Sequence, residues 1–458
     1  MNHADIVILG GGSGGYACAF RAAQLGLSVI LVEKDKLGGT CLHRGCIPTK
    51  ALLHAAEVAD TAREGDRIGV KSSVAGIDLA GVNAYKDSVI TKLHKGLQGL
   101  AAVNKVTLVN GTGRLVGPGT VEVDGQRYTG RHVVLATGSY AKTLPGIEIG
   151  GPVITSDQAL SLDVVPDKVI VLGGGVIGVE FASVWRSFGA EVTIVEALPR
   201  LLPGDDEFAS KGLTRAFRKR GIKVRTKARV SGVERGGDGV TDGVTVILDN
   251  GDRLEADLLL VAVGRGPHSA GHGYQEAGVT VDRGFVVTDE RLRTNLPDVH
   301  AVGDLVAGPQ LAHRGFQHGI FVAEDIAGLA PAPIDEDTIP RVTYCRPEVA
   351  SVGLTETAAT EKYGAVETLT YDLAGNGKSQ ILQTSGGIKL IKAPNGAIVG
   401  VTMVGERVGE LIGEAQVILG TGATATDLAS LVHAHPTQNE ALGEALLAMA
   451  GKPLHTHA

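Results

Sequence analysis

Apolar and polar positions near the start of the chain follow the pattern of a strand, a glycine cluster, a helix and a second strand. Residues 5–9 form an uninterrupted apolar run that is typical of a buried strand. Six residues, five of them glycine, follow at 10–15, then a helical pattern at 16–25 and another apolar run at 28–32 that ends at Glu33. The pattern predicts a βαβ unit with parallel strands.

The same unit recurs in the middle of the chain. An apolar run at 168–172 leads into a glycine cluster at 173–178, a helical pattern at 179–188 and a second run at 191–195 that ends at Glu196. In both copies the acid stands 23 positions after the first glycine. The chain is therefore expected to contain two nucleotide-binding folds, which implies two nucleotides, or one dinucleotide and a lost site.

Each glycine of the first cluster has a separate physical reason. Gly10 allows a tight turn, Gly12 allows close approach of a pyrophosphate, and Gly15 allows the helix to pack on the strand, while Glu33 is placed to bind a ribose hydroxyl. A bare glycine triad would be weak evidence, but here the strand, the helix and the acid are all in place. This segment is predicted to bind a dinucleotide.

The second copy repeats these features with Gly173, Gly175, Gly178 and Glu196. A carboxylate at the end of the second strand hydrogen-bonds a free 2′-hydroxyl and repels a 2′-phosphate, which favours NAD over NADP. Arg200 lies four positions further on, and its positive charge is an argument for NADP.

The segments around these units complete the pattern. Residues 51–110 are expected to be helical, with short strands around 106–129, and each unit ends in an apolar closing strand, at 133–139 and at 258–264. Thr137 and Gly138 end the first closing strand, where glycine lets the backbone approach a ligand.

The last part of the chain changes character. Asp304 brings a carboxylate to a glycine turn. A helix is expected from 310 towards 329, and a proline-rich acidic linker follows it at 331–337. Beyond it, β-rich stretches alternate with helices near 408–420 and 439–449, with no third glycine fingerprint. This region is predicted to be a separate α+β domain.

Two cysteines five positions apart, Cys41 and Cys46, are the candidate chemistry of the first unit. In an ideal helix their Cα atoms would lie roughly 8–9 Å apart, beyond the ~7 Å limit for a disulfide. Gly45 and Pro48 disfavour a regular helix until after Pro48, which brings the sulfurs within reach. A bridge that closes so few residues stabilises little, so a redox role is favoured, although spacing alone also fits two unpaired core cysteines. A helix opening at Pro48, with Lys50 nearby, favours a thiolate at Cys46.

Composition and charge exclude several classes of function. A formal net charge of −7 without a sustained basic run argues against nucleic acid or an anionic membrane as a partner. Four cysteines in 458 residues do not form a secreted disulfide scaffold, the first strand leaves no room for a signal peptide, and no apolar run approaches the ~20 residues of a membrane span. We expect a cytoplasmic protein, in which a real disulfide is more often catalytic than structural. Cys18, Cys345 and Trp185 are expected to be packing residues.

Taken together, the chain resembles the flavin-dependent pyridine nucleotide–disulfide oxidoreductases over essentially its whole length, and within them the enzymes that oxidise dihydrolipoamide. The resemblance rests on the segment Gly-Gly-Thr-Cys41-x4-Cys46-Ile-Pro-x-Lys50, on His435-Pro-Thr-x-x-Glu440, and on the order of the motifs. It implies an α/β fold with two Rossmann-like domains, for FAD and NAD, and a C-terminal α+β dimerisation domain. The expected divisions are FAD-binding, first part, 1–145; NAD-binding, 146–268; FAD-binding or central, second part, 269–334; and dimerisation, 335–458.

The resemblance also implies roles for individual residues. FAD is expected on the first fingerprint, with Asp304 on its ribityl chain, and NAD on the second; Lys50 is expected to pair with Glu180 near the flavin. Cys46 is expected next to the flavin, with Cys41 exchanging with substrate. Further expected cofactor contacts, several with weaker motif support, are Thr40, Gly113, Thr137, Gly138, Ala312, Val230 and Gly264.

The family is homodimeric, and its His-Pro segment completes the active site of the other subunit. On that basis His435 is expected to act as the acid–base group for the dithiol, with Glu440 orienting its ring. His433 is expected to be an ordinary histidine. The implied partners are a second copy of the chain and lipoyl domains of an acyltransferase or carrier protein, and no metal is expected.

Four alternative functions fit the sequence less well. A mercuric reductase would need a further cysteine pair near the C-terminus, and no cysteine follows Cys345. A glutathione-type reductase takes NADPH through arginines where this chain carries Glu196. An NADH oxidase with one active cysteine fits less well, and a catalytically silent structural subunit is disfavoured because every reactive position is present.

Overall fold

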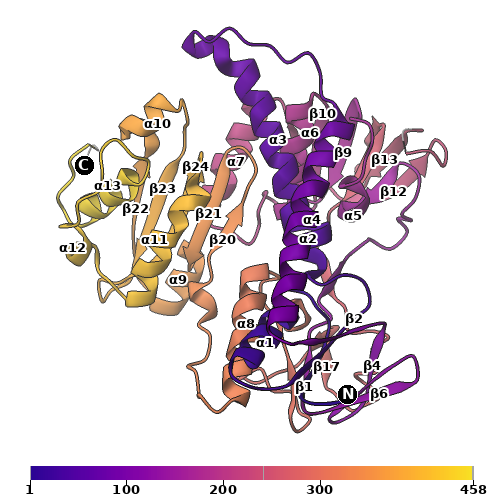
Figure 1. The fold of residues 1–458 in the computed structure, drawn as a ribbon. Helices are drawn as coiled ribbons and strands as arrows, with labels where there is room; N and C mark the ends of the chain where they lie inside the picture. The colour runs from indigo at the N-terminus through magenta and orange to yellow at the C-terminus, as the bar shows by residue number, and fades with distance from the viewer. Residues whose placement is uncertain (1, 241, 456–458) are drawn as a thin grey trace.

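Three lobes make up the computed structural model, which describes residues 2–240 and 242–455 (Figure 1). The first lobe is built from two parts of the chain, one that precedes the second lobe and one that follows it. The third lobe consists of the C-terminal residues. The N-terminus lies at the first lobe and the C-terminus on the outer side of the third.

The first lobe is built on a sheet with strand order β3-β2-β1-β6-β5-β4, and β19 pairs with β6. Strands β1, β2, β3, β6 and β19 are parallel because the intervening chain returns over the sheet faces, whereas β4 and β5 form an antiparallel extension. Helix α1 packs against helix α8, which follows the second lobe in the sequence. The bounds are β1 (His3–Leu9), α1 (Ser13–Gln24), β2 (Val29–Glu33), β3 (Thr107–Asn110), β4 (Gly113–Gly117), β5 (Thr120–Val123), β6 (Gln126–Leu135), β19 (Val299–Ala301) and α8 (Ala312–Ile326).

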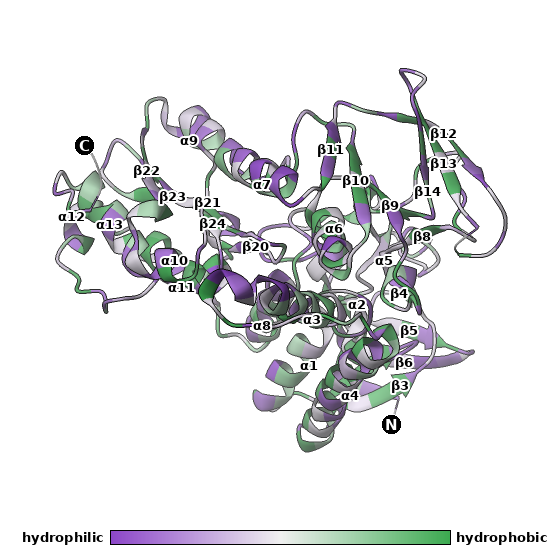
Figure 2. Cartoon of the chain, turned by 90° about the horizontal axis from the view of Figure 1, so that it is seen from above, coloured by the Kyte–Doolittle hydropathy of each residue, from purple (hydrophilic) through white to green (hydrophobic). Residues whose placement is uncertain are grey.

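The second lobe repeats this design. Its parallel sheet has the order β11-β10-β9-β15-β8, and a three-stranded antiparallel sheet, β12-β13-β14, is attached. Ten of the thirteen residues of α6 are buried, because α6 lies between this sheet and helix α3 (Figure 2). The bounds are β8 (Val153–Thr155), α5 (Ser156–Ala159), β9 (Lys168–Leu172), α6 (Val176–Phe188), β10 (Glu191–Glu196), α7 (Glu207–Lys219), β11 (Lys223–Thr226), β12 (Val230–Arg235), β13 (Val244–Leu248), β14 (Arg253–Ala256) and β15 (Leu258–Val261).

Short elements connect the lobes. Strand β7 from the first lobe pairs with β16, which follows the second, so the two crossings of the chain lie side by side. The bounds are β7 (Ser139–Ala141), β16 (Arg265–Pro267), β17 (Val281–Asp282), β18 (Phe285–Val286), and the 3-10 turns η2 (Gly303–Leu305) and η3 (Glu336–Thr338).

The third lobe is an antiparallel sheet with the order β20-β21-β24-β23-β22, covered on one face by α11 and α13. It has its own apolar core, in which Ile388, Leu390 and Met403 of the sheet meet Leu442 and Leu446 of α13. The bounds are β20 (Arg341–Thr343), β21 (Glu348–Gly353), α9 (Glu356–Tyr363), β22 (Glu367–Asp372), η4 (Leu373–Gly375), α10 (Gly377–Ile381), β23 (Gly387–Lys392), β24 (Ile398–Gly405), α11 (Val408–Thr421), α12 (Ala425–Leu428) and α13 (Glu440–Met449).

Several expected element bounds were wrong. Helices α1 and α6 begin three residues earlier than expected, at Ser13 and Val176, because the later fingerprint glycines lie inside the first helical turn. The region expected to be helical at 51–110 is instead helix α3 (Cys46–Glu64), the 3-10 turn η1 (Gly65–Ile68), an irregular stretch, helix α4 (Leu79–Val103) and strand β3.

Candidate active site

The two cysteines of the first lobe lie at a break between two helices. Cys41 is in α2 (Gly39–Arg44), and Cys46 is the first residue of α3. Between them Gly45 leaves the helical conformation, with φ −149° and ψ −108°, which turns the chain so that the two thiols lie close enough to interact. Both cysteines are free thiols in this structure. The expected proximity is confirmed, but the helix begins at Cys46 rather than at Pro48, because the break at Gly45 alone is sufficient.

The surroundings of the pair make the two sulfurs chemically different. The hydrogen bond from Cys41 lowers the pKa of Cys46, burial opposes this, and the charge of Lys50 lowers that pKa further. The same hydrogen bond, together with burial, raises the pKa of Cys41. When one proton is shared by the pair, the negative charge therefore resides on Cys46.

Lys50 and Glu180 form an ion pair between the first two lobes. Lys50 lies one turn after Cys46 on α3, and its Nζ is 2.8 Å and 2.9 Å from the two carboxylate oxygens of Glu180 on α6. Burial acts to lower the pKa of Lys50, but Glu180 outweighs it and raises that pKa overall. The backbone N–H of Tyr344 donates to Glu180 at 3.0 Å, and the Lys50 ammonium lies 4.7 Å from the centre of the Tyr344 ring. The pairing expected from the sequence is confirmed, and Lys50 carries a fixed positive charge beside Cys46.

The first glycine cluster forms a cradle at the start of α1. Gly10 has φ +109°, and a Cβ there would lie 2.3 Å from the carbonyl oxygen of Ala136. A Cβ on Gly15 would lie 1.9 Å from the carbonyl oxygen of Gly10, so Gly15 lets the helix pack on the turn. Around Gly12, by contrast, the nearest atom to such a Cβ is 4.0 Å away, and α1 begins there without a side-chain cap. The open amides and the helix N-terminus form a site for an anion such as a pyrophosphate.

The second cluster repeats this geometry closely. Gly173 has φ +113° and its Cβ would lie 2.3 Å from the carbonyl oxygen of Ala262, while a Cβ on Gly178 would lie 2.0 Å from the oxygen of Gly173. Nothing lies within 4 Å of a Cβ on Gly175, where α6 begins, again without a side-chain cap. The two cradles are thus built to hold the same kind of group.

Each cradle has its acid at the end of the second strand. Glu33 accepts hydrogen bonds from the backbone N–H groups of Gly11, at 2.7 Å, and Asp35, at 2.8 Å. Glu196 accepts from the corresponding positions, Gly174 at 2.6 Å and Leu198 at 2.7 Å. These backbone bonds hold both carboxylates at the rim of their cradles, where a ribose hydroxyl would be recognised.

One continuous cavity of about 1590 Å³ connects the two cradles and the cysteine pair. A typical small-molecule site measures roughly 300–1,000 Å³, so this cavity has room for more than one cofactor. Most of the residues singled out from the sequence line it, namely Gly10, Gly12, Glu33, Thr40, Cys41, Cys46, Lys50, Gly113, Thr137, Gly138, Gly173, Gly175, Glu180, Glu196, Val230, Gly264, Asp304 and Ala312. Gly15 and Gly178 lie beneath the cradles, as packing residues.

Asp304 is held in this cavity by residues that sequence reasoning missed. The hydroxyl of Ser139 donates to Asp304 at 2.5 Å, and Arg265 donates to that hydroxyl and to the Ser139 carbonyl oxygen, both at 2.8 Å. Thr137 is fixed in turn by bonds to the His268 carbonyl oxygen and the Tyr274 hydroxyl. Ser139 is the last residue of the first predicted closing strand and Arg265 directly follows the second, which is the only sequence signal that pointed to them.

The other expected catalytic group lies elsewhere on the chain. His435 Nδ1 is 2.8 Å from a carboxylate oxygen of Glu440, whose second oxygen accepts from the Thr437 N–H at 2.6 Å. Slight burial acts to raise the pKa of Glu440, but these two contacts lower it overall. The His435 side chain is 75% exposed, and neither residue lines the cavity in the part of the chain described. A single chain therefore orients His435 through Glu440 without bringing it to the cysteines.

Neither a metal site nor a membrane-spanning helix is found within residues 2–240 and 242–455. In these ranges no cluster of three or more His, Cys, Asp or Glu side chains has the arrangement of a metal site. None of the helices described there combines the length and the apolar character that crossing a bilayer requires.

Comparisons with known proteins agree with this geometry. The family model described as pyridine nucleotide-disulphide oxidoreductase matches residues 4–319, and the model of that family's dimerisation domain matches residues 339–446. A dihydrolipoyl dehydrogenase of Bacillus subtilis is 39% identical, over 98% of this chain and 99% of its own. The mitochondrial dihydrolipoyl dehydrogenase of Pisum sativum is 40% identical, over 98% and 92%. The crystal structure of LpdA from Mycobacterium tuberculosis superposes with a TM-score of 0.90 at 26% identity, over 98% of this chain and all of that one.

Proposed function

Because this chain belongs to the pyridine nucleotide-disulphide oxidoreductase family, we propose that it oxidises protein-bound dihydrolipoamide to lipoamide and passes the electrons to NAD. It is an oxidoreductase that uses FAD and NAD. The observation that carries the proposal is a single cavity that is lined by a polarised cysteine pair and by two glycine cradles.

The two cofactors are assigned to the two cradles. Gly10, Gly12 and Glu33 would hold FAD together with Asp304, and Gly173, Gly175 and Glu196 would hold NAD. The fit is supported by the open space beside Gly12 and Gly175 and by the uncapped helix starts there. FAD, when bound, supplies a two-electron carrier between the dithiol and the nicotinamide.

The residues of the chain carry the thiol chemistry. With the pair oxidised, a substrate thiolate attacks the sulfur of Cys41, the Cys41–Cys46 bond breaks, and Cys46 leaves as a thiolate stabilised by Lys50. The second substrate thiol, after losing its proton, attacks the substrate sulfur of the mixed disulfide, which releases lipoamide and leaves Cys41 reduced. Two electrons have then moved from substrate to the cysteine pair.

The acid–base group for these steps is assigned to His435 of the partner subunit. Imidazole titrates close to neutrality and accepts the thiol protons, and Glu440 orients the ring and stabilises its charged form. The match to the family's dimerisation domain supports a homodimer, and the exposure of His435 supports a role across its interface. Lipoyl domains as partners, and a cytoplasmic location, are parts of this proposal.

NAD is preferred to NADP in this proposal. Both carboxylate oxygens of Glu196 are held at the rim of the second cradle, where a 2′-phosphate would meet a negative charge. Arg200 donates to the carbonyl oxygens of Pro203 and Asp205, so its side chain is engaged.

A substrate panel tests the proposal. Purified protein with bound FAD would be assayed with dihydrolipoamide, glutathione disulfide and mercuric ion, each with both nicotinamide cofactors. We expect rapid oxidation of dihydrolipoamide with NAD and a strong preference over NADP. Faster turnover of glutathione disulfide with NADPH would instead assign a glutathione-type reductase, and no turnover of any of these substrates would assign a structural subunit.

A further inference from the structure

The short turn η2 brings Asp304 to the wall of the cavity and is held by two sets of contacts. In the first set, the Ser139 hydroxyl donates to the Asp304 carboxylate at 2.5 Å. The second set comes from helix α8, which packs against the turn. Gly303, the first residue of the turn, has φ +68°, and glycine changes its backbone conformation at little steric cost. The shape of the turn therefore depends on what α8 contributes.

A buried histidine of α8 makes the contact closest to Asp304 in sequence. The backbone N–H of Gly303 donates to Nδ1 of His318 at 3.2 Å, and the His318 side chain is only 1% exposed. Because Nδ1 accepts this bond it carries no proton, so the proton of the neutral ring lies on Nε2. Nε2 is 3.4 Å from a carboxylate oxygen of Glu336. The ring is thus held between a backbone donor and a carboxylate acceptor.

The surroundings of His318 keep its ring neutral. Burial acts first to lower the pKa of His318, and the charge of Arg314 lowers it further. Glu336 and Asp304 act to raise this pKa, but they do not outweigh the burial. A neutral ring keeps the lone pair on Nδ1, whereas a protonated ring would set two N–H groups against each other. The direction of the pKa shift therefore agrees with the direction of the hydrogen bond.

Arg314 lies one turn before His318 on α8 and holds the chain beyond the turn. Its guanidinium donates to the carbonyl oxygen of Ala307 at 2.7 Å, and its Nε is 2.8 Å and 2.9 Å from the two carboxylate oxygens of Glu336. Glu336 belongs to η3, in the linker that leads to the third lobe. One carboxylate therefore fixes both α8 side chains, and these in turn fix residues 303–307.

We propose that His318 is a positioning residue for FAD binding, because it accepts the Gly303 N–H and so fixes the turn that presents Asp304 to the cofactor. This inference rests on the proposed function, which assigns Asp304 to FAD. Without the acceptor, the buried N–H of Gly303 must find another partner, and the turn relaxes in the cofactor-free protein. FAD binding must then restore the turn. Loss of the contact therefore weakens FAD binding, whereas a purely structural role would change stability alone.

The test compares His318→Asn with His318→Leu, two variants whose side chains have nearly the same shape. The amide oxygen of asparagine takes the place of Nδ1 and accepts from Gly303, whereas leucine puts a methyl group there. We expect the Kd for FAD to rise about tenfold or more in His318→Leu and to stay within about threefold of the unmodified value in His318→Asn. Equilibrium dialysis of the full-length protein against FAD measures both. Equal Kd values in the two variants would overturn the inference.

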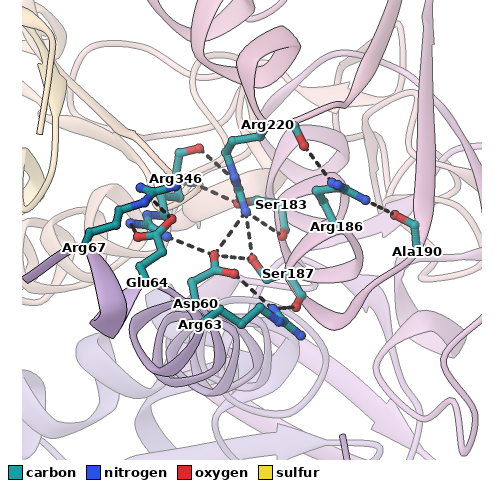
Figure 3. A network of polar contacts seen from close by, with 10 residues as sticks. All are labelled: Asp60, Arg63, Glu64, Arg67, Ser183, Arg186, Ser187, Ala190, Arg220 and Arg346. Atoms are coloured by element: carbon teal, nitrogen blue, oxygen red, sulfur yellow. Dashed lines mark hydrogen bonds and ion pairs between the residues drawn. The ribbon is translucent and has the colours of Figure 1, made fainter. Parts of the chain in front are cut away.

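Ser187→Ala is the control for a general loss of stability. Ser187 is a buried residue of α6 in the polar network of Figure 3, where its hydroxyl donates to Asp60 and accepts from Arg220, both at 2.7 Å. Among the residues described, those that line the cavity do not include Ser187. We expect Ser187→Ala to lower the melting temperature and to leave the Kd for FAD unchanged. If that Kd rises as much as in His318→Leu, the effect is one of stability and the inference is wrong.

Two further outcomes are informative. If His318→Leu does not fold, His318→Met takes its place, because its flexible chain fills the same space and its sulfur is only a weak acceptor. The same rise in Kd is expected, and a value equal to that of His318→Asn overturns the inference. If the unmodified protein binds no FAD, the proposed function fails, and with it the premise. If that protein binds FAD and oxidises dihydrolipoamide while the apolar variant keeps the unmodified Kd, this inference alone fails.

Discussion

At the scale of single residues, the hydrogen bond between the thiols favours Cys46 as the thiolate, and the charge of Lys50 stabilises that thiolate further. The Lys50 ammonium is held by Glu180 at 2.8 Å and lies beside Cys46, while Cys41 keeps its proton through the hydrogen bond between the sulfurs. A fixed cation lowers the pKa of a neighbouring thiol by stabilising its charged form. Removing the cation should therefore raise that pKa.

The first prediction concerns Lys50→Met. The pH at which the long-wavelength thiolate absorbance reaches half its maximum should rise by about one unit, because Cys46 loses a charge that favours its thiolate. A spectrophotometric pH titration of the reduced enzyme measures it. An unchanged or lower midpoint would mean that Lys50 does not stabilise Cys46.

The second prediction concerns His435→Gln. Dihydrolipoamide oxidation should slow by roughly 10²–10⁴-fold, the usual contribution of a general acid–base group, while FAD content stays unchanged. Stopped-flow reduction by dihydrolipoamide is the measurement. His433→Gln is the matched control, since His433 contacts Glu414 rather than Glu440, and its rate should stay within a few-fold of the unmodified enzyme. Equal rates in the two variants would place the base elsewhere.

Residues with strong local signals could be predicted from the sequence. The contact of Cys41 with Cys46, and the ion pair of Lys50 with Glu180, follow from motifs and are found in the structure. Ser139, Arg265 and Tyr344 could not be predicted, because each reaches the site through a contact with a segment far away in sequence. The roles of the site residues in catalysis stay predictions.

At the scale of elements, the two strand–glycine–helix units have nearly the same local geometry. The third fingerprint glycine in each would place a Cβ 1.9–2.0 Å from the carbonyl oxygen of the first, and the second glycine in each faces open space. Packing and ligand approach are therefore separate functions of neighbouring glycines.

This separation gives the third prediction, a comparison of Gly178→Ala with Gly175→Ala. Gly178→Ala should lower the thermal stability of the protein, because the methyl group meets the Gly173 carbonyl oxygen, with a cost of about 1–3 kcal/mol. Gly175→Ala should leave the melting temperature nearly unchanged and raise the Kd for NAD, because the space it fills is where a pyrophosphate is expected. Calorimetry and NAD titration separate the two effects, and equal melting temperatures for the two variants would contradict the assignment.

Element types were predicted better than their bounds. The strands of both units follow from continuous apolar runs, but the starts of α1 and α6 were missed because their first turns are rich in glycine, a weak helix former. The start of α3 at Cys46 was missed because Pro48 was expected to begin the helix. Proline is tolerated throughout the first turn, and here it is the third residue of the helix.

At the scale of the whole molecule, the residues expected to react lie in two separate places on the chain. The cysteine pair lines the cavity between the first two lobes, whereas His435 projects from the third lobe. Close to His435, Val432 is 96% exposed and Leu431 is 55% exposed, so two neighbouring large apolar side chains face solvent in the single chain. A second copy of the chain would cover them and deliver its histidine.

Lobe organisation could be predicted from the repeated fingerprint and the later change to β-rich sequence, and the two family matches support it. The limits near residues 145, 268 and 334 stay predictions. How the lobes contact one another could not be predicted, since it depends on long-range pairs such as Arg220 with Asp60.

The most direct test of the shared active site is complementation in a hybrid dimer. One subunit would carry Cys46→Ser and the other His435→Gln, each with a different affinity tag, so that only the hybrid is isolated. If the cysteines of one subunit work with the histidine of its partner, the hybrid keeps one complete site and about half of the normal dihydrolipoamide:NAD activity, while both parent homodimers have almost none. A hybrid as inactive as its parents would show that each chain builds its site alone and would contradict the account.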